Sequence, residues 1–251
     1  MNFGFVSGAW RSTAAASLLV LAGCASAAAF DDYFVAIKRD DPNAITTLLN
    51  RNVDPNALSP DGEAPLVLAI REQSTKAVKA LLASRKTKVE IRNKKDESPL
   101  MLAAIKGDTD LVRALLARDA DVNKPGWAPL HYAASASTPQ QATIAKLLLD
   151  NHAFIDAESP NGTTPLMMAA FYGSSDVARL LLAEGADTAM RNQQGMTAVD
   201  FARKGGREDL AKEIAAAATK SAAGQPARTP QPTSPGAIQP SPQQSGPRSG
   251  W

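Results

Sequence analysis

The sequence is poor in the residues that carry most metal and acid–base chemistry. Its 251 residues include one Cys and two His, and the Cys, Cys24, lies near the N-terminus. The rest of the chain therefore has no disulfide. No Cys pair, no H-x-x-x-H spacing and no clustered carboxylates at helical spacing are present, so the common metal motifs are excluded. The glycines form no phosphate-binding loop. The sequence predicts no cofactor, no metal and no catalytic residues.

Aromatic residues and net charge are also low. Aromatics make up 5% of the chain, and the formal net charge is +2. A charge so close to zero argues against a dedicated nucleic-acid binder. Ala and Leu dominate, as closely packed short helices require. The length is sufficient for one elongated domain.

What the chain has in abundance is one recurring segment. The pattern P-L-x-x-A begins at Pro65, Pro99, Pro129 and Pro165, and a degenerate copy begins at Ala198. The spacings are 34, 30, 36 and 33 residues, and a period close to 33 signals a stacked repeat array. A first copy without the Pro-Leu signature begins at Phe30. We therefore expect about six units, at residues 30–61, 62–95, 96–125, 126–161, 162–194 and 195–219.

Each unit is predicted to form two helices. Pro in the first turn sacrifices no hydrogen bond, and Ser98 or Thr164 can cap the helix that follows it. Gly107 and Gly173 are expected to end first helices in a left-handed conformation. In the second helix, apolar residues are spaced by three and four, and Gly185 is a second stop. Polar turns follow, and four Asp residues are assigned to one turn position: Asp54, Asp121, Asp156 and Asp187.

These features resemble the ankyrin repeat. The resemblance rests on Thr164-Pro165-Leu166, Ala169-Ala170, Gly173, Leu180-Leu181-Leu182 and Gly185-Ala186-Asp187, and on "GWAPLHYAA" from Gly126 to Ala134. It covers about three quarters of the chain, although Ala64 and Ala128 replace the usual Thr. The resemblance implies an all-α ankyrin-repeat solenoid that is no enzyme and binds a protein through its concave loop and short-helix surface.

Residues of that surface can be predicted from their position in the repeat. The two positions after the Ala pair and the turn tips do not support the core. Most are polar, but three consecutive units place apolar side chains there, and aromatics with a charged rim are typical of binding hot spots. Three lysines beside them could steer an acidic partner. The candidate residues are Lys94, Lys95, Ile105, Lys106, Trp127, Phe171 and Tyr172. Alternatively the apolar residues pack on their neighbours, and the lysines form a solvated face.

The two histidines have structural interpretations. His131 lies where the ankyrin pattern uses His to brace the turn, and His152 lies at a helix end. The competing hypothesis is an envelope enzyme or stress-protection factor that uses His131 and the insertion "SASTPQQ" as a site. No base or nucleophile adjoins His131 in the sequence.

Both ends of the chain differ from the repeats. Residues 1–27 read as a signal peptide of bacterial style, too short to be a comfortable membrane span. Cleavage is expected either before Cys24, in a lipobox-like "LAGC" that would make Cys24 the lipidated residue, or near residues 27–29. The Pro-rich segment 220–251 is predicted to be disordered.

The sequence thus predicts a monomeric, non-enzymatic protein-binding module. It would be exported and would reside in the periplasm or be lipid-anchored on the envelope. Its partner is an unknown protein rather than nucleic acid, and it would meet the membrane only through a lipid anchor at Cys24. The alternative is a secreted effector that acts on host proteins.

Overall fold

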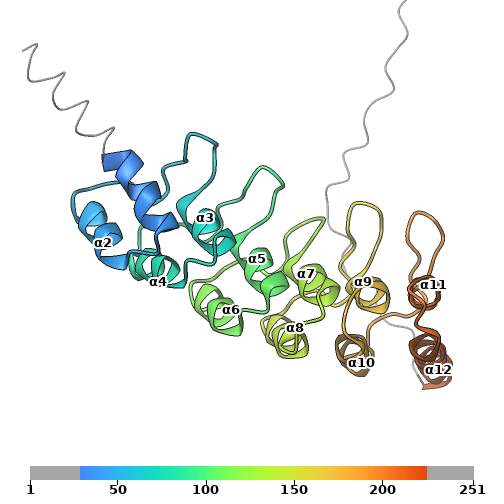
Figure 1. Ribbon diagram of the computed structural model, residues 1–251. Helices are drawn as coiled ribbons and strands as arrows, with labels where there is room; N and C mark the ends of the chain where they lie inside the picture. The colour runs from blue at the N-terminus through green and yellow to red at the C-terminus, as the bar shows by residue number, and fades with distance from the viewer. Residues whose placement is uncertain (1–28, 225–251) are drawn as a thin grey trace, which may run out of the picture.

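The computed structural model describes residues 29–224 as a row of helix pairs (Figure 1). The first pair consists of the helix at residues 29–38 and α2 (Pro42–Asn50). The following pairs are α3 (Pro65–Arg71) with α4 (Thr75–Ala83), α5 (Pro99–Lys106) with α6 (Thr109–Leu116), α7 (Pro129–Ser135) with α8 (Gln141–Asp150), α9 (Pro165–Phe171) with α10 (Ser175–Ala183), and α11 (Ala198–Lys204) with α12 (Glu208–Gly224). Residues 29–224 contain no β-strand. The predicted all-α stack of two-helix units is confirmed.

The helices form two parallel rows. Figure 1 shows the first helices of the units in an inner row, from which the long loops project: α3, α5, α7, α9 and α11. The second helices form an outer row: α4, α6, α8, α10 and α12. Each inner helix starts at its loop and runs away from it, and the outer helix returns. The short turn between the two helices therefore lies at the end that is remote from the loops.

The inner helices begin as the sequence predicts. Pro occupies the first turn of α3, α5, α7 and α9. The Ser98 hydroxyl accepts a hydrogen bond from the Met101 amide at 3.3 Å, and the Thr164 hydroxyl accepts one from Met167 at 3.4 Å. These caps satisfy amides that have no partner within the helix.

The ends of the inner helices confirm one glycine prediction and correct another. Gly107 is left-handed, with φ at 74°, as expected. Gly173 does not have a positive φ. A Cβ atom there would lie 1.9 Å from the carbonyl oxygen of Ala134 in the preceding unit. Glycine is required at this position because two units approach closely there.

Four of the second helices, α2, α6, α8 and α10, are followed by a left-handed residue. Asp119, His152 and Gly185 have φ values of 59°, 67° and 87°, and Asn52 has 64°. The predicted roles of Gly185 as a stop and of His152 as a helix-end residue are confirmed.

One continuous apolar core runs through the stack. The same position of α4, α6, α8 and α10 supplies a Leu, and Leu81, Leu115, Leu148 and Leu181 are fully buried. Around them the Ala pairs of the inner helices are buried between units. No unit can bury this surface alone, so each one depends on its neighbours for stability.

Polar side chains join consecutive units along one edge. Asn56, Glu90, Asn123 and Asp156 each accept a hydrogen bond, at 2.7–2.9 Å, from a backbone amide of the next unit. This contact corrects the assignment of Asp156 to the turn position of Asp54, Asp121 and Asp187, whose carboxylates accept from the amide two residues ahead. Phe154, rather than Asp156, occupies the repeat position of those three residues.

Two arginines satisfy carbonyl groups that the helix ends leave free. Arg118 donates to Leu82 O and Thr87 O, each at 2.8 Å. Arg207 donates to Ala169 O and Gly173 O, each at 2.7 Å. Since each arginine lies one unit beyond its acceptors, these bonds also hold units together.

The predicted end segments lie largely outside the described residues. The signal peptide 1–27 and Cys24 fall there, as does most of the predicted tail. Helix α12 continues to Gly224, so the predicted boundary at residue 220 falls inside a helix. Within the described part of the chain, no helix is both long and apolar enough to cross a membrane.

Candidate partner-binding surface

The seven predicted binding residues lie in two separate rows. Ile105, Lys106, Phe171 and Tyr172 follow the Ala pairs at the loop-remote ends of α5 and α9; we call them the helix-end row. Lys94, Lys95 and Trp127 lie in the loops before α5 and α7; we call them the loop row. A seven- or eight-residue helix, about 11–12 Å long, separates the rows.

Tyr172 is the most exposed large side chain of the helix-end row, at 60%. Its ring contacts Phe171 edge-on, with centroids 4.3 Å apart, and Phe171 contacts Phe201 at 6.3 Å. Phe171 is half-buried and packs against the core. The core thus fixes Phe171, and Phe171 supports an aromatic ring that faces solvent.

Two units away, the same row is apolar and charged. Ile105 is 39% exposed. The Lys106 ammonium donates to the carbonyl oxygen of Arg71 at 3.4 Å. The Arg71 side chain forms ion pairs with Glu63 and Glu72. The charge of Arg71 is therefore balanced by carboxylates, whereas Lys106 is held by a backbone carbonyl.

The loop row is supported by buried side chains of the loops and of α7. Trp127 is half-buried, and its ring lies 5.3 Å from that of His131. The buried Lys124 pairs with Asp96 in the preceding loop and lowers the pKa of that carboxyl. Lys94 and Lys95 are exposed at the tip of the same preceding loop. Trp127 thus combines exposed surface with a packing role, whereas the exposed Lys94 side chain lies over Gly62 of the loop before α3.

His131 braces the loops, as its position predicts. It is fully buried; its Nδ1 accepts from the Ala128 amide at 3.1 Å, and its Nε2 lies 2.9 Å from Thr163 O in the next unit. This pairing requires the neutral ring with its proton on Nε2. Burial lowers the pKa of His131 to about 4. The ring is closed to substrates and already uses both nitrogens.

The insertion "SASTPQQ", which the enzyme hypothesis treats as part of a site, fills space between units. Gln141 is buried, and its amide nitrogen lies 3.2 Å from the Thr138 hydroxyl and 3.4 Å from Ile105 O. Thr138 packs against Gly107, where a Cβ atom would lie 2.4 Å from its hydroxyl. The insertion therefore seals the contact between two units.

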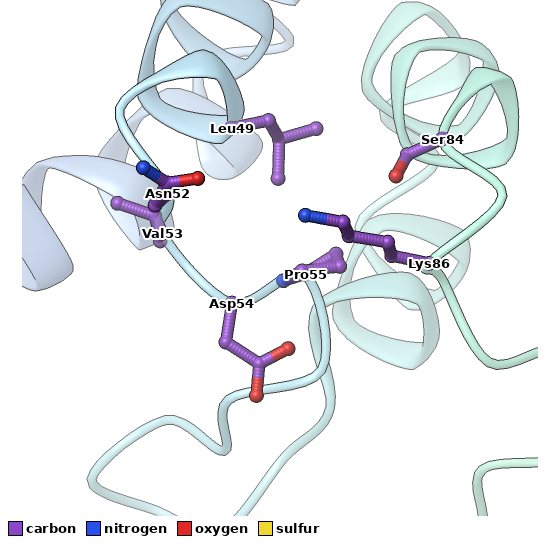
Figure 2. Close-up of a pocket in the computed structure, with 7 residues that line it drawn as sticks. All are labelled: Leu49, Asn52, Val53, Asp54, Pro55, Ser84 and Lys86. Atoms are coloured by element: carbon purple, nitrogen blue, oxygen red, sulfur yellow. The ribbon is translucent and has the colours of Figure 1, made fainter.

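The cavities found in the described part of the chain are at or below the lower end of the ligand-site range. One of about 330 Å³ lies between the helix at residues 29–38 and α2. Another, of about 220 Å³, lies between the end of α2 and the loop after α4. Figure 2 shows Lys86 reaching across it toward Leu49 and Asn52, while Asp54 points away. Drug-sized ligand sites have about 300–1,000 Å³. Among residues 29–224, no group of His, Cys, Asp and Glu could hold a metal ion.

Sequence reasoning missed a periodic row of cations on the outer helices. One repeat position is basic in five consecutive units: Lys79, Arg113, Lys146, Arg179 and Lys212. The period of 33 or 34 residues was the available signal. All five side chains are exposed.

Acidic neighbours neutralise the later members of this row. Lys146 pairs with Glu184 in the next unit at 3.3 Å. Arg179 makes a bidentate contact with Glu213, at 2.8 and 3.0 Å. Lys79 makes no ion pair within the described part of the chain.

Comparisons with known proteins agree on the type of repeat. The family model described as ankyrin repeats (3 copies) matches residues 33–125, 85–159 and 135–222. Over 81 residues, 32% of this chain, the sequence is 37% identical to "Ankyrin repeat and SAM domain-containing protein 6" of Mus musculus and 33% identical to "Ankyrin repeat and LEM domain-containing protein 1 homolog" of Caenorhabditis elegans. The matched segments are 9% and 12% of those proteins.

A solved structure is similar over most of the stack. An ankyrin repeat domain from Acinetobacter baumannii AYE superimposes with a TM-score of 0.64 at 22% identity, over 73% of this chain and 96% of that one. At this identity the likeness concerns the fold alone.

Proposed function

This chain belongs to the ankyrin repeat family, and we propose that it holds its protein partner along the helix-end row, with Tyr172 at the centre of the contact. Ankyrin repeats are scaffolds for protein–protein interaction, typically without catalytic activity. The proposal adds the place of binding. The partner spans Ile105, Lys106, Phe171 and Tyr172, and the loop row forms the far rim.

The exposed ring of Tyr172 carries this proposal. Tyrosine is enriched among residues that dominate binding energy, because a large ring gains contact area at little entropic cost. Here the ring rests on Phe171, which rests on the core. The surface is formed before the partner arrives, so little ordering entropy opposes association.

Site-specific photocrosslinking tests the place of binding. A photoreactive phenylalanine analogue is placed at position 172 of the full chain, expressed in its own cells. Phe154 is the matched control, because it is 42% exposed but lies at the loop-proximal end of α8. We expect one discrete protein adduct from position 172 and none from position 154. Adducts from both positions, or from neither, would contradict the proposal.

Trp127 should behave differently from Tyr172 because it also packs on His131. We expect Trp127→Ala to weaken partner binding and also to lower the melting temperature. Its half-buried ring contributes to the packing of the loops. An aromatic pair adds about 0.5–1.5 kcal/mol of stability beyond the contribution of its buried area. Thermal denaturation followed by circular dichroism measures this loss. An unchanged melting temperature would show that Trp127 is a surface residue only.

We further propose that the module is exported and acts in the periplasm or on the envelope surface. The apolar N-terminal stretch that ends in small residues supports this. Intact-mass analysis of the mature protein separates the two routes: an acylated N-terminal Cys24 or an unmodified N-terminus near residues 27–29. A mature chain that keeps Met1 and the whole stretch would contradict export.

A secreted effector is the second candidate, since the same stretch directs export. Fractionation of a culture distinguishes the two. Recovery of the mature chain with the envelope supports the first proposal, and recovery from the medium or from host cells supports the second.

A further inference from the structure

The net charge of +2 conceals a strongly basic segment. From Lys76 to Lys95, eight of 20 residues are Lys or Arg and one is Glu, which gives this segment a net charge of +7. The described residues before it and after it are both net acidic. The positive charge is therefore concentrated in the second unit.

Five of these cations are carried by α4 and by the loop that follows it. Lys76 and Lys79 are three residues apart, so they share the exposed face of α4. Arg85, Lys86 and Lys88 lie in the loop beyond the end of α4. We call these five residues the basic ridge. All are exposed, and none makes an ion pair within the described part of the chain.

The residue at position 76 explains why Lys79 has no acidic neighbour on its own helix. Its counterparts one, three and four units later are Asp110, Asp176 and Asp209. Asp176 pairs with Arg179 at 3.4 Å, and Asp209 pairs with Lys212 at 3.1 Å. In the second unit a Lys replaces this Asp, so Lys79 loses its local partner and gains a like charge.

The ridge lacks the apolar centre that a protein interface requires. Interface cores are enriched in aromatics and depleted in Lys. The large exposed apolar residues of the described chain are Val35, Leu58, Ile105, Phe154 and Tyr172, and none belongs to the ridge. The ridge also lacks aromatics on which the bases of single-stranded nucleic acid would stack. Its chemistry instead suits a broad surface of fixed negative charge, which attracts clustered Lys and Arg without specific contacts.

We propose that the basic ridge docks the stack onto an anionic phospholipid surface. Helix α4 is about 14 Å long, so the cations on it and in the loop that follows it can meet several headgroups at once. Lys86 extends over the small cavity beside α2 (Figure 2). This orientation leaves the helix-end row free, so the proposal is independent of the protein-binding function above.

Vesicle binding tests this proposal with a charge-matched control. The ridge variant carries Lys79→Gln, Lys86→Gln and Lys88→Gln in the full chain. The control carries Arg113→Gln, Lys146→Gln and Lys212→Gln, which remove the same charge from the outer helices of later units. Sedimentation with vesicles of phosphatidylglycerol and phosphatidylcholine gives the affinity. Vesicles of phosphatidylcholine alone report the contribution of the apolar N-terminal stretch, which is identical in all three proteins.

The expected result is a loss specific to the ridge. Each cation near an anionic surface contributes about fivefold in affinity, so the ridge variant should bind mixed vesicles about 100-fold more weakly. The control should bind within about threefold of the unmodified chain, and binding should weaken as salt rises, because screening shortens the range of the attraction.

Three results would overturn the proposal. The first is equal binding of the unmodified chain to mixed and neutral vesicles. The second is an equal loss in both variants. The third is unchanged vesicle binding by the ridge variant, combined with a loss of affinity for an acidic protein or for nucleic acid. Circular dichroism of both variants confirms that they are folded.

Discussion

The outer surfaces of the second and fifth units have similar geometry and opposite electrostatics. Both present a cation at the same repeat position, Lys79 on α4 and Arg179 on α10. Arg179 pairs with Glu213 and with Asp176, which raise its pKa. Lys79 has Lys76 as its neighbour and makes no ion pair within the described part of the chain. At this position the Asp of the fifth unit is replaced by a Lys in the second, which adds a positive charge where the fifth unit has a negative one.

This difference shows which constraints the repeat imposes. Largely the same repeat positions are buried in both units, because each unit must bury an apolar face against its neighbours. The exposed positions are free to diverge, because changes there barely affect stacking. Function in this molecule should therefore be sought where one unit departs from the others at an exposed position.

The largest predicted effect tests whether the second and fifth units contribute equally to the apolar core. Leu81→Ala in the second unit and Leu181→Ala in the fifth should each cost about 2–5 kcal/mol of unfolding free energy, because both remove a fully buried side chain. Urea denaturation followed by circular dichroism measures both. A loss below about 1 kcal/mol in only one of them would show that the units differ in their cores as well as their surfaces.

A second prediction concerns the buried histidine between these two units. The folded pKa of His131 is lowered to about 4, so the unfolded chain, with a His pKa near 6.5, binds the proton more tightly. The His131 contribution to stability is therefore complete above pH 6.5 and is lost as the pH falls from 6.5 toward 4. Between about pH 7.5 and pH 5 it should fall by about 2 kcal/mol.

The matched variant is His131→Met, because Met101 and Met167 occupy the same repeat position. The sulfur atoms of both accept a hydrogen bond from the amide that precedes the helix, as His131 Nδ1 does. We expect the pH dependence of the unfolding free energy to be about 2 kcal/mol smaller over this range in the variant. Identical pH profiles of the two proteins would mean that folding does not change the pKa of His131.

The smallest predicted effect has opposite signs in the two units. Lys79→Gln should leave the melting temperature unchanged or raise it, because it relieves repulsion from Lys76. Arg179→Gln should lower it, because Asp176 and Glu213 lose their counterion. Both differences should shrink between about 10 mM and 1 M salt, as the Debye length falls from about 30 to 3 Å. Changes of the same sign in scanning calorimetry would contradict the comparison.

The sequence was most informative where a physical constraint recurs in every unit. The Pro-Leu starts, Ser98 and Thr164 as caps, and Gly185 as a stop follow from backbone rules, so they were predictable. Gly173 was assigned the wrong reason because close approach to Ala134 is a contact between units, which a local pattern does not contain. Asp156 was grouped with turn residues for the same reason.

The candidate surface was only partly predictable. Its rows follow from the repeat position, but the exposure of each side chain does not. Phe171 is half-buried because Phe201 lies beside it, and Trp127 is half-buried because it packs on His131. The charge of the basic ridge is visible in the sequence, as the +7 segment from Lys76 to Lys95. That its cations make no ion pair within the described part of the chain depends on contacts between units, which the sequence does not give.

The most direct test of the account is a paired measurement on Tyr172→Ala and Phe154→Ala, using the partner recovered by crosslinking. Titration calorimetry gives the affinity, and thermal denaturation gives the stability, of each variant. The account predicts that Tyr172→Ala weakens binding by about 2 kcal/mol at an unchanged melting temperature, and that Phe154→Ala changes neither. Equal losses of affinity, or a loss for Tyr172→Ala that follows a lowered melting temperature, would contradict it.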